Sequence, residues 1–208
     1  MKPIKNEMTA KKAARQSDII LASLELLQEN GLEGITLRKL AARLDMQAPT
    51  LYWYFKDKRA LTDFMADKIL QDKFDDLIIV EDREEWQEWL KATMLKLRQA
   101  MLHYRDGGRV VTGAHLGPGR TLAKIIAYSL ESLQKCGLTA DDSQNITMTA
   151  LHFTFGRVIE EQESPSKSEM KEFQDETVFV EYPYLNQLIH NGLSTEEEFR
   201  NSLKLIIK

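Results

Sequence analysis

The 208-residue chain contains one cysteine and no long hydrophobic run, and both absences exclude whole classes of protein. A single thiol, Cys136, excludes an internal disulfide framework. No apolar stretch approaches the roughly 20 residues that span a bilayer, and the polar N-terminus MKPIKNEMTAKK lacks the hydrophobic centre of a signal peptide. The composition is that of a soluble globular protein, and we expect a cytoplasmic location.

The sequence also lacks the usual signatures of catalysis and metal binding. It contains no glycine-rich phosphate loop, no paired metal ligands and no nucleophile with an assignable base. His103, His152 and His190 do not have the spacing of zinc ligands, and Cys136 is more simply interpreted as a small buried hydrophobe. We therefore predict neither an enzyme nor a bound metal or cofactor.

Charge is divided unevenly along the chain. Residues 1–60 contain 11 lysines and arginines against 7 acidic residues, whereas residues 61–208 contain 17 against 25. The overall charge of −4 therefore hides a basic N-terminal part joined to an acidic remainder. This division fits a DNA-reading module of residues 1–60 on a separate body of residues 61–208.

Hydrophobic residues recur with helical period in nearly every segment, and strand-like alternation appears nowhere at convincing length. We predict an all-α protein. It has an N-terminal three-helix, helix-turn-helix DNA-binding domain and a C-terminal helical domain for ligand binding and dimerisation. The expected helices lie at about 11–30, 36–44, from Pro49 onward, 57–77, 84–103, 106–112, 120–135, 139–162, 180–190 and 194–208.

Residues 36–61, TLRKLAARLDMQAPTLYWYFKDKRAL, have the layout of the helix-turn-helix unit. Thr36 is a favourable N-cap for the first helix, and Asp45 with Met46 makes the turn. Pro49 fits the first turn of the next helix, where its missing N–H costs nothing. Asp57 is the expected N-cap of a longer helix that leaves the unit and enters the body.

The second helix of this unit carries large side chains that a small core does not need. Leu51 and Phe55 should face inward, so Thr50, Trp53 and Tyr54 share the opposite, exposed face. The DNA major groove, about 12 Å wide, admits such a helix and lets its first residues reach base edges. Packing of both aromatic rings inside a three-helix core is the alternative.

Nine side chains of the unit are candidates for contact with DNA. Polar groups can hydrogen-bond bases, and proline or aromatic rings can pack on thymine methyl groups. Other groups bind phosphates, which fixes the register without reading sequence. The first set is Gln47, Pro49, Thr50, Trp53 and Tyr54; the second is Thr36, Tyr52 and Lys58; Arg38 could reach either a phosphate or a guanine.

This segment closely resembles the N-terminal domain of the tetracycline-repressor (TetR) family. The family motif ends in a Tyr-x-x-Phe-x-x-Lys run, which Tyr52, Phe55 and Lys58 match, and the resemblance covers about residues 12–65. It implies a homodimer that binds a palindromic operator and releases it when a small molecule binds. It also implies that the nine side chains above, Thr36 excepted, occupy operator-contacting positions.

Parts of the body are similar to the tetracycline repressors within that family. They are the Trp86-Gln87 start of a helix, the sequence YRDG at 104–107 and the segment LHFTFGRVIEEQE at 151–163. Tetracycline repressors hold a magnesium–tetracycline chelate through a histidine shortly after the Arg-Asp-Gly turn, and this position is Val111 here. The resemblance therefore implies an effector site that lacks this metal ligand.

Other ligand-contacting positions of that subgroup also differ. A drug-contacting histidine is replaced by Phe74, and an asparagine and a phenylalanine are replaced by Thr93 and Leu97. We predict a mostly apolar pocket for a different, less metal-dependent small molecule. Its expected lining is Phe74, Thr93, Leu97, Val111, Leu116 and Phe155, with His115 nearby.

Two helices carry more apolar surface than one subunit can easily cover. The helix at 139–162 is apolar on several faces, and the last helix, 194–208, adds a further stripe. Four-helix packing of these helices from two chains would cover both surfaces, and the resemblance implies that arrangement. A helix central to its own core is the alternative. The apolar side chains include Ile146, Met148, Ala150, Phe153, Phe155, Phe199, Leu203 and Ile206.

The predicted function is a ligand-responsive transcriptional repressor, a dimer whose reading helices lie about 34–36 Å apart. Effector bound against the helix at 57–77 would tilt that helix and change the separation. Two alternatives stay open. One is a constitutive DNA-binding dimer without an effector, which a side-chain-filled C-terminal domain would favour, and the other, less well supported, is an α-helical enzyme.

Overall fold

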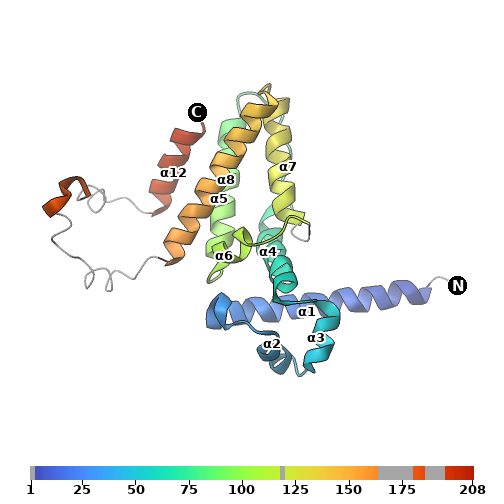
Figure 1. Cartoon of the computed structure of the whole chain (residues 1–208). Helices are drawn as coiled ribbons and strands as arrows, with labels where there is room; N and C mark the ends of the chain where they lie inside the picture. Colours follow the sequence, from blue (N-terminus) through green and yellow to red (C-terminus); the bar gives the residue numbers. More distant parts are fainter. Residues whose placement is uncertain (1–2, 118–119, 164–179, 186–194) are drawn as a thin grey trace.

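The computed structural model describes residues 3–117, 120–163, 180–185 and 195–208. Within these ranges every regular element is a helix and none is a strand, which confirms the all-α fold class. An upright bundle of helices stands on a smaller N-terminal unit (Figure 1). No helix in the described ranges is both long and apolar enough to cross a membrane.

The N-terminal unit consists of α1 (Pro3–Gly34), α2 (Leu37–Arg43) and α3 (Ala48–Tyr54). Helix α1 begins eight residues earlier than predicted, at a proline, a residue suited to a first helical position. It is broken where expected, at Gly31, whose φ of 69° lies in the left-handed region. The Thr36 hydroxyl accepts a hydrogen bond from the backbone N–H of Lys39 at 3.1 Å, which confirms the N-cap.

Helix α4 (Lys58–Phe74) connects the N-terminal unit to the body. Asp57 caps it as predicted, because its carboxylate accepts the backbone N–H of Ala60 at 2.8 Å. The helix was expected to reach about residue 77 but ends at Phe74. Asp75 and Asp76 follow there, and acidic side chains disfavour continuation at the negative end of the helix dipole.

The body contains α5 (Trp86–Leu102), the short α6 (Gly107–Thr112), α7 (Arg120–Lys135) and α8 (Ala140–Glu163). Helix α12 (Thr195–Ile206) lies alongside α8 and also contacts α5 (Figure 1). Of the helix predicted at 180–190, only 180–185 is described, and it includes a 3-10 turn at Pro183–Leu185. Residue 194, the predicted cap of the last helix, lies outside the described residues.

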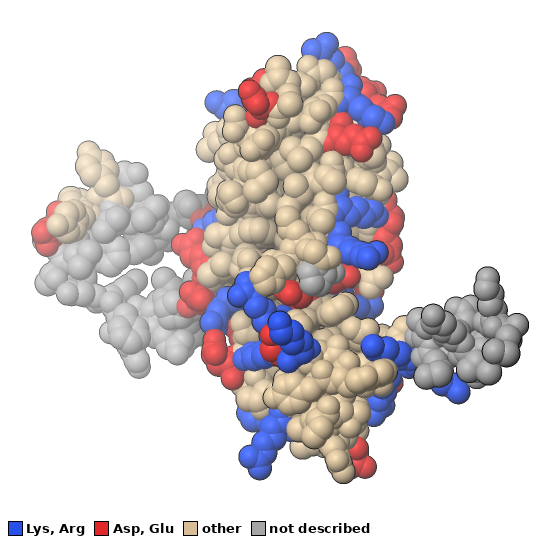
Figure 2. Space-filling view, turned by 45° about the vertical axis from the view of Figure 1, so that its right-hand side comes forward, with Lys and Arg blue, Asp and Glu red and all other residues tan. Residues whose placement is uncertain are grey.

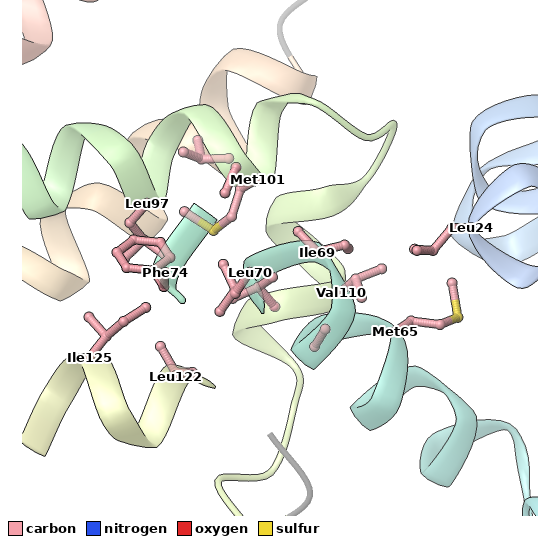
Figure 3. Packing of buried hydrophobic residues seen from close by; sticks show 14 of the residues in the cluster. Leu24, Met65, Ile69, Leu70, Phe74, Leu97, Met101, Val110, Leu122 and Ile125 are labelled. Atoms are coloured by element: carbon pink, nitrogen blue, oxygen red, sulfur yellow. The ribbon is translucent and has the colours of Figure 1, made fainter. Parts of the chain in front are cut away.

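One hydrophobic core runs through both parts of the molecule. Leu24 of α1 faces Met65 of α4, so the N-terminal unit packs directly on the connecting helix (Figure 3). Further along α4, the Phe74 ring lies beside Leu97 of α5 and Ile125 of α7. Helix α4 therefore contributes side chains to both ends of this core.

Candidate nucleic-acid interface and effector region

The exposed face of α3 carries the polar and aromatic side chains that the sequence placed there. Leu51 and Phe55 are buried, at 0% and 1% exposed, and hold the helix against the unit. Trp53 is 64% exposed and Tyr52 56% exposed. The remaining exposed members of the predicted set on and beside α3 are Gln47, Pro49 and Thr50.

Tyr54 differs from the prediction, because it is half-buried and packs partly against the core. Its ring meets that of Trp53 edge to face, with centroids 5.0 Å apart. A short helix allows only part of its circumference to face outward, and Tyr54 lies at the border of that face. The structure therefore makes Trp53 the principal exposed aromatic group of α3.

Lys12 of α1 is a member of this surface that sequence reasoning missed. Its ammonium group lies 4.1 Å from the centre of the Trp53 ring, a cation–π contact. Both residues are exposed, and they lie far apart in sequence, so no local pattern joins them. The contact positions the Trp53 ring and places a positive charge beside it.

Three of the groups predicted to reach phosphates, Arg38 among them, are placed differently from one another. Arg38 on α2 is exposed, while the Thr36 hydroxyl already accepts the capping hydrogen bond. Lys58 is half-buried, and its ammonium group donates to the backbone carbonyl of Leu32 at 2.8 Å. Lys58 therefore ties the start of α4 to the end of α1, and this bond uses only one of the three N–H donors of its ammonium group.

Lysine and arginine side chains border the α1–α3 unit at the bottom of the view in Figure 2, whereas a broad uncharged surface covers the body above. Not all of these cations are available to a ligand. Arg43 binds Glu29 and Glu25 at 2.8 and 3.0 Å, and these bonds, chiefly the one to Glu29, raise its pKa. The available positive charge on α2 is therefore carried by Arg38 and Lys39 rather than by Arg43.

The residues predicted to line an effector pocket are not brought together into an open cavity. Phe74, Thr93, Leu97 and Val111 are each less than 5% exposed, and three of them belong to the hydrophobic core cluster. They come from the facing helices α4, α5 and α6, as expected. Buried side chains of the core, among them Phe74 and Leu97, lie between these helices (Figure 3).

The other three predicted lining residues lie at or near the surface. His115 contacts Asp63 in the first half of α4. Its backbone N–H and its Nδ1 lie 2.9 and 3.1 Å from the carboxylate of Asp63, which is only 4% exposed. Its Nε2 lies 2.8 Å from Nη2 of Arg59. Leu116 is 51% exposed and Phe155 of α8 is half-buried.

The side chains at the predicted effector region do not fit the magnesium site of tetracycline repressors. Val111 is fully buried and offers no ligand atom. Over the part of the chain that the structure describes, no three His, Cys, Asp or Glu side chains gather in a way that could hold a metal ion. We therefore assign no metal ligand in this region.

Cys136 has the environment of a packing residue. It is 2% exposed, and its Sγ lies 3.2 Å from the backbone carbonyl of Asp82. Burial raises the pKa of the thiol, and the nearby carboxylates of Asp82 and Glu81 raise it further. Because the thiolate is the reactive form, this environment suppresses thiol chemistry at neutral pH.

Comparison with known proteins covers both parts of the chain. Residues 19–63 match a family described as bacterial regulatory proteins, tetR family. Residues 80–208 match the tetracyclin repressor-like, C-terminal domain. The first range contains α2 and α3, and the second contains every helix from α5 onward.

Individual relatives and structures extend this similarity. The tetracycline repressor protein class A from transposon 1721 of Escherichia coli is 40% identical over 148 residues, 71% of this chain and 67% of that protein. A structure of class A TetR with 5a,6-anhydrotetracycline and magnesium is 30% identical, with a TM-score of 0.66 over 91% of this chain and 94% of the other. BioQ with its natural double-stranded DNA operator is 25% identical, with a TM-score of 0.63 over 71% and 87%.

Proposed function

This chain belongs to the tetR family of bacterial regulatory proteins, and we propose that it represses transcription by binding a palindromic DNA operator as a homodimer. Its relatives are transcriptional regulators rather than enzymes. We propose residues 1–60 as the DNA-binding domain and residues 61–208 as the domain for effector binding and dimerisation.

The observation that carries the proposal is the exposed face of α3. A helix with solvent-exposed Trp53, Tyr52 and Thr50 exposes apolar ring surface to water, which is unfavourable unless a partner covers it. The major groove is wide enough for such a helix, and its base edges offer both hydrogen-bonding groups and thymine methyl groups. We assign Gln47, Pro49, Thr50, Trp53 and Tyr54 to base edges, Tyr52, Thr36 and Lys58 to the backbone, and Arg38 to either.

We propose that α8 and α12 form the dimer interface. Residues 143–156 of α8 contain no lysine, arginine, aspartate or glutamate, although Thr149, His152 and Gly156 of this stretch are exposed. A Cβ placed on Gly156 would meet nothing within 4 Å, so this side of the helix is open to a partner. An exposed helix face without charges suits a second copy of the same helix across a twofold axis.

The proposed effector region lies where α4 ends. We propose that a mostly apolar small molecule binds among Phe74, Thr93, Leu97 and Val111, with Phe155, His115 and Leu116 towards its edge. Since these buried side chains occupy the space, the ligand must displace Phe74, the last residue of α4. Binding would then move the helix that carries the DNA-binding domain, and the coupling requires ligand and operator to prefer different positions of α4.

A dimer that binds its operator without any effector is the second candidate, and the close packing around Phe74 favours it. The two candidates differ in one measurable property. A library of apolar and amphipathic small molecules, screened by thermal shift with and without magnesium, should contain compounds that raise Tm and weaken operator binding. Compounds that raise Tm without changing operator affinity would support the constitutive dimer.

The first test is the selection of bound duplexes from a random DNA pool. We expect a pseudo-palindrome whose half-sites are about 10 base pairs apart, or a multiple of that spacing, because each reading helix enters one major groove. Affinity for the selected duplex should fall steeply with salt, since phosphate contacts release counterions. Recovery of no sequence preference, or of a single half-site, would contradict dimeric operator binding.

Replacing Trp53 with alanine should weaken binding to the selected duplex by about 10- to 100-fold, which corresponds to about 1.4–2.7 kcal/mol. The ring is mostly exposed in the free protein, so its removal should change Tm little. Fluorescence anisotropy with a labelled duplex measures the affinity. Tyr184→Ala is the matched control, because Tyr184 is an 82% exposed aromatic residue outside the N-terminal unit. Equal affinities for Trp53→Ala and the wild type would exclude Trp53 from the interface.

A further inference from the structure

The turn between α5 and α6 is held by a single side chain from the end of α8. Gln162 donates from Nε2 to the backbone carbonyls of Met101 and Tyr104, at 3.3 and 2.8 Å. Its Oε1 accepts the backbone N–H of Gly108 at 2.9 Å. One amide thus satisfies three backbone groups, on both sides of the turn.

The turn also lies against α8 closely enough to require glycine. A Cβ on Gly108 would lie 2.8 Å from Cγ1 of Val158 and 3.0 Å from Oε1 of Gln162. Real Cβ atoms essentially never approach a carbon so closely, so a larger residue would force the turn or the facing side chains of α8 to shift. Hydrogen bonding and steric fit therefore fix the same distance.

The opposite side of this turn holds the end of α1. The carboxylate of Asp106 accepts the backbone N–H of Leu32 at 2.7 Å. The backbone N–H of Arg105 donates to Oε1 of Gln28 at 2.9 Å, and its guanidinium donates to the carbonyl of Glu29 at 3.2 Å. Three contacts thus join the turn to the DNA-binding domain.

Close fit reinforces these contacts. Asp106 adopts a left-handed conformation, with φ of 54°, and Gly31 has φ of 69°. A Cβ on Gly31 would lie 2.8 Å from Oδ2 of Asp106. The end of α1 and the turn therefore meet at a position where neither backbone can shift without losing a contact.

We propose that Gln162 is a positioning residue that fixes the separation of the two recognition helices in the dimer. It acts through the α5–α6 turn, which joins the dimerisation helix α8 to the end of α1. This inference rests on the proposed operator-binding dimer. A domain attached through α4 alone could swing about that helix, whereas a second attachment from α8 restricts the swing. Gln162 thus links the dimer axis to the DNA-binding domain through the α5–α6 turn, in addition to the link through α4.

The experiment measures how strictly the protein selects the spacing of its half-sites. Two probes are compared: the duplex selected by the wild-type protein, and the same duplex with one base pair inserted at its centre. The insertion increases the separation of the half-sites by about 3.4 Å and rotates one half-site relative to the other about the duplex axis. The wild type should bind the first duplex much more tightly. Gln162→Met, which keeps the length but removes the polar atoms, should lower this ratio of affinities by about fivefold or more.

The matched control is Gln134→Met, the same substitution at an exposed position on α7, outside the proposed interfaces. It should leave the ratio of affinities unchanged. A purely structural role for Gln162 would lower affinity for both duplexes alike, or lower Tm, without changing their ratio. An unchanged ratio in Gln162→Met would therefore overturn the inference.

A second variant keeps the test decisive if Gln162→Met fails to dimerise. Gln28→Met removes the hydrogen bond from Arg105 at the far end of the same route, and its side chain is exposed on α1, away from α8. This variant too should lower the ratio of affinities for the two duplexes, and an unchanged ratio would overturn the inference. A wild-type protein that binds both duplexes equally, or binds neither, would instead refute dimeric operator binding and the inference with it.

Discussion

Replacement of Phe74 by alanine is expected to lower the free energy of unfolding by about 3–5 kcal/mol. The Phe74 ring is 1% exposed and lies between Leu97 of α5 and Ile125 of α7 (Figure 3). Truncation removes the contacts of the ring and leaves a cavity that three helices can fill only by moving together. Urea unfolding followed by circular dichroism, with the slope compared between variants, measures the loss.

The same substitution also tests the effector region. A cavity in this position would be lined by apolar side chains, and engineered apolar cavities bind small apolar molecules. We expect such a compound to stabilise Phe74→Ala more than the wild type. Ile78→Ala, a 69% exposed residue just beyond α4, is the control and should change stability little. A loss below about 1 kcal/mol in Phe74→Ala would show that the region collapses easily, and would argue against an effector site there.

Removal of the Glu161 carboxylate should destabilise the protein by a similar amount, about 3–5 kcal/mol. Glu161 of α8 receives two hydrogen bonds from Arg98 of α5, at 2.6 and 3.1 Å, and the two side chains are only 11% and 6% exposed. The guanidinium also lies 5.4 Å from the ring centre of Phe199. In Glu161→Leu the buried positive charge of Arg98 loses its partner. Chemical denaturation measures the resulting change in the free energy of unfolding.

The double variant separates the charge from the packing. Arg98→Met combined with Glu161→Leu removes both charges, and buried ion pairs replaced by apolar groups often cost little. We therefore expect the double variant to be more stable than Glu161→Leu alone. Glu163→Leu, at an exposed position two residues further along α8, is the control. If the loss of stability in the double variant equals the sum of the losses in Arg98→Met and Glu161→Leu, then packing, rather than an unpaired charge, dominates at this site.

The local parts of the fold could be predicted because their physical causes are local. Thr36 and Asp57 cap their helices as expected, and Thr139 accepts the backbone N–H of Asp142 at the start of α8. Gly31 and Gly137 have left-handed φ values, the first at the break in α1 and the second just after α7. Each of these features depends on residues within one or two helical turns.

The parts that could not be predicted depend on contacts between distant segments. Nothing near Lys58 in sequence indicates that its ammonium group binds the carbonyl of Leu32, and the Tyr-x-x-Phe-x-x-Lys motif suggested only a phosphate contact. The partners of Asp106 and Gln162 likewise lie more than 50 residues away. A single sequence contains no record of such pairs, so these links became visible only in the fold.

The two candidate sites also differ in how far they could be predicted from the sequence. The direction of Trp53 followed from helical periodicity, because Leu51 and Phe55 fix the buried side of α3. Whether the effector region is open or filled could not be predicted from the sequence. Phenylalanine at position 74 indicates apolar surroundings, but it does not indicate whether the ring lines a cavity or occupies it. Only the arrangement of α4, α5 and α7 decides that question (Figure 3).

The exposure of Trp53 also provides the protein with an optical reporter. The chain has three tryptophans, and the other two, Trp86 and Trp89, lie on α5, where the first is 7% exposed and the second is half-buried. A collisional quencher such as iodide or acrylamide should therefore reach the indole of Trp53 before the others. Protection of that emission by a duplex would report occupancy of the reading helix in unlabelled protein, and its return on adding a small molecule would follow release in real time.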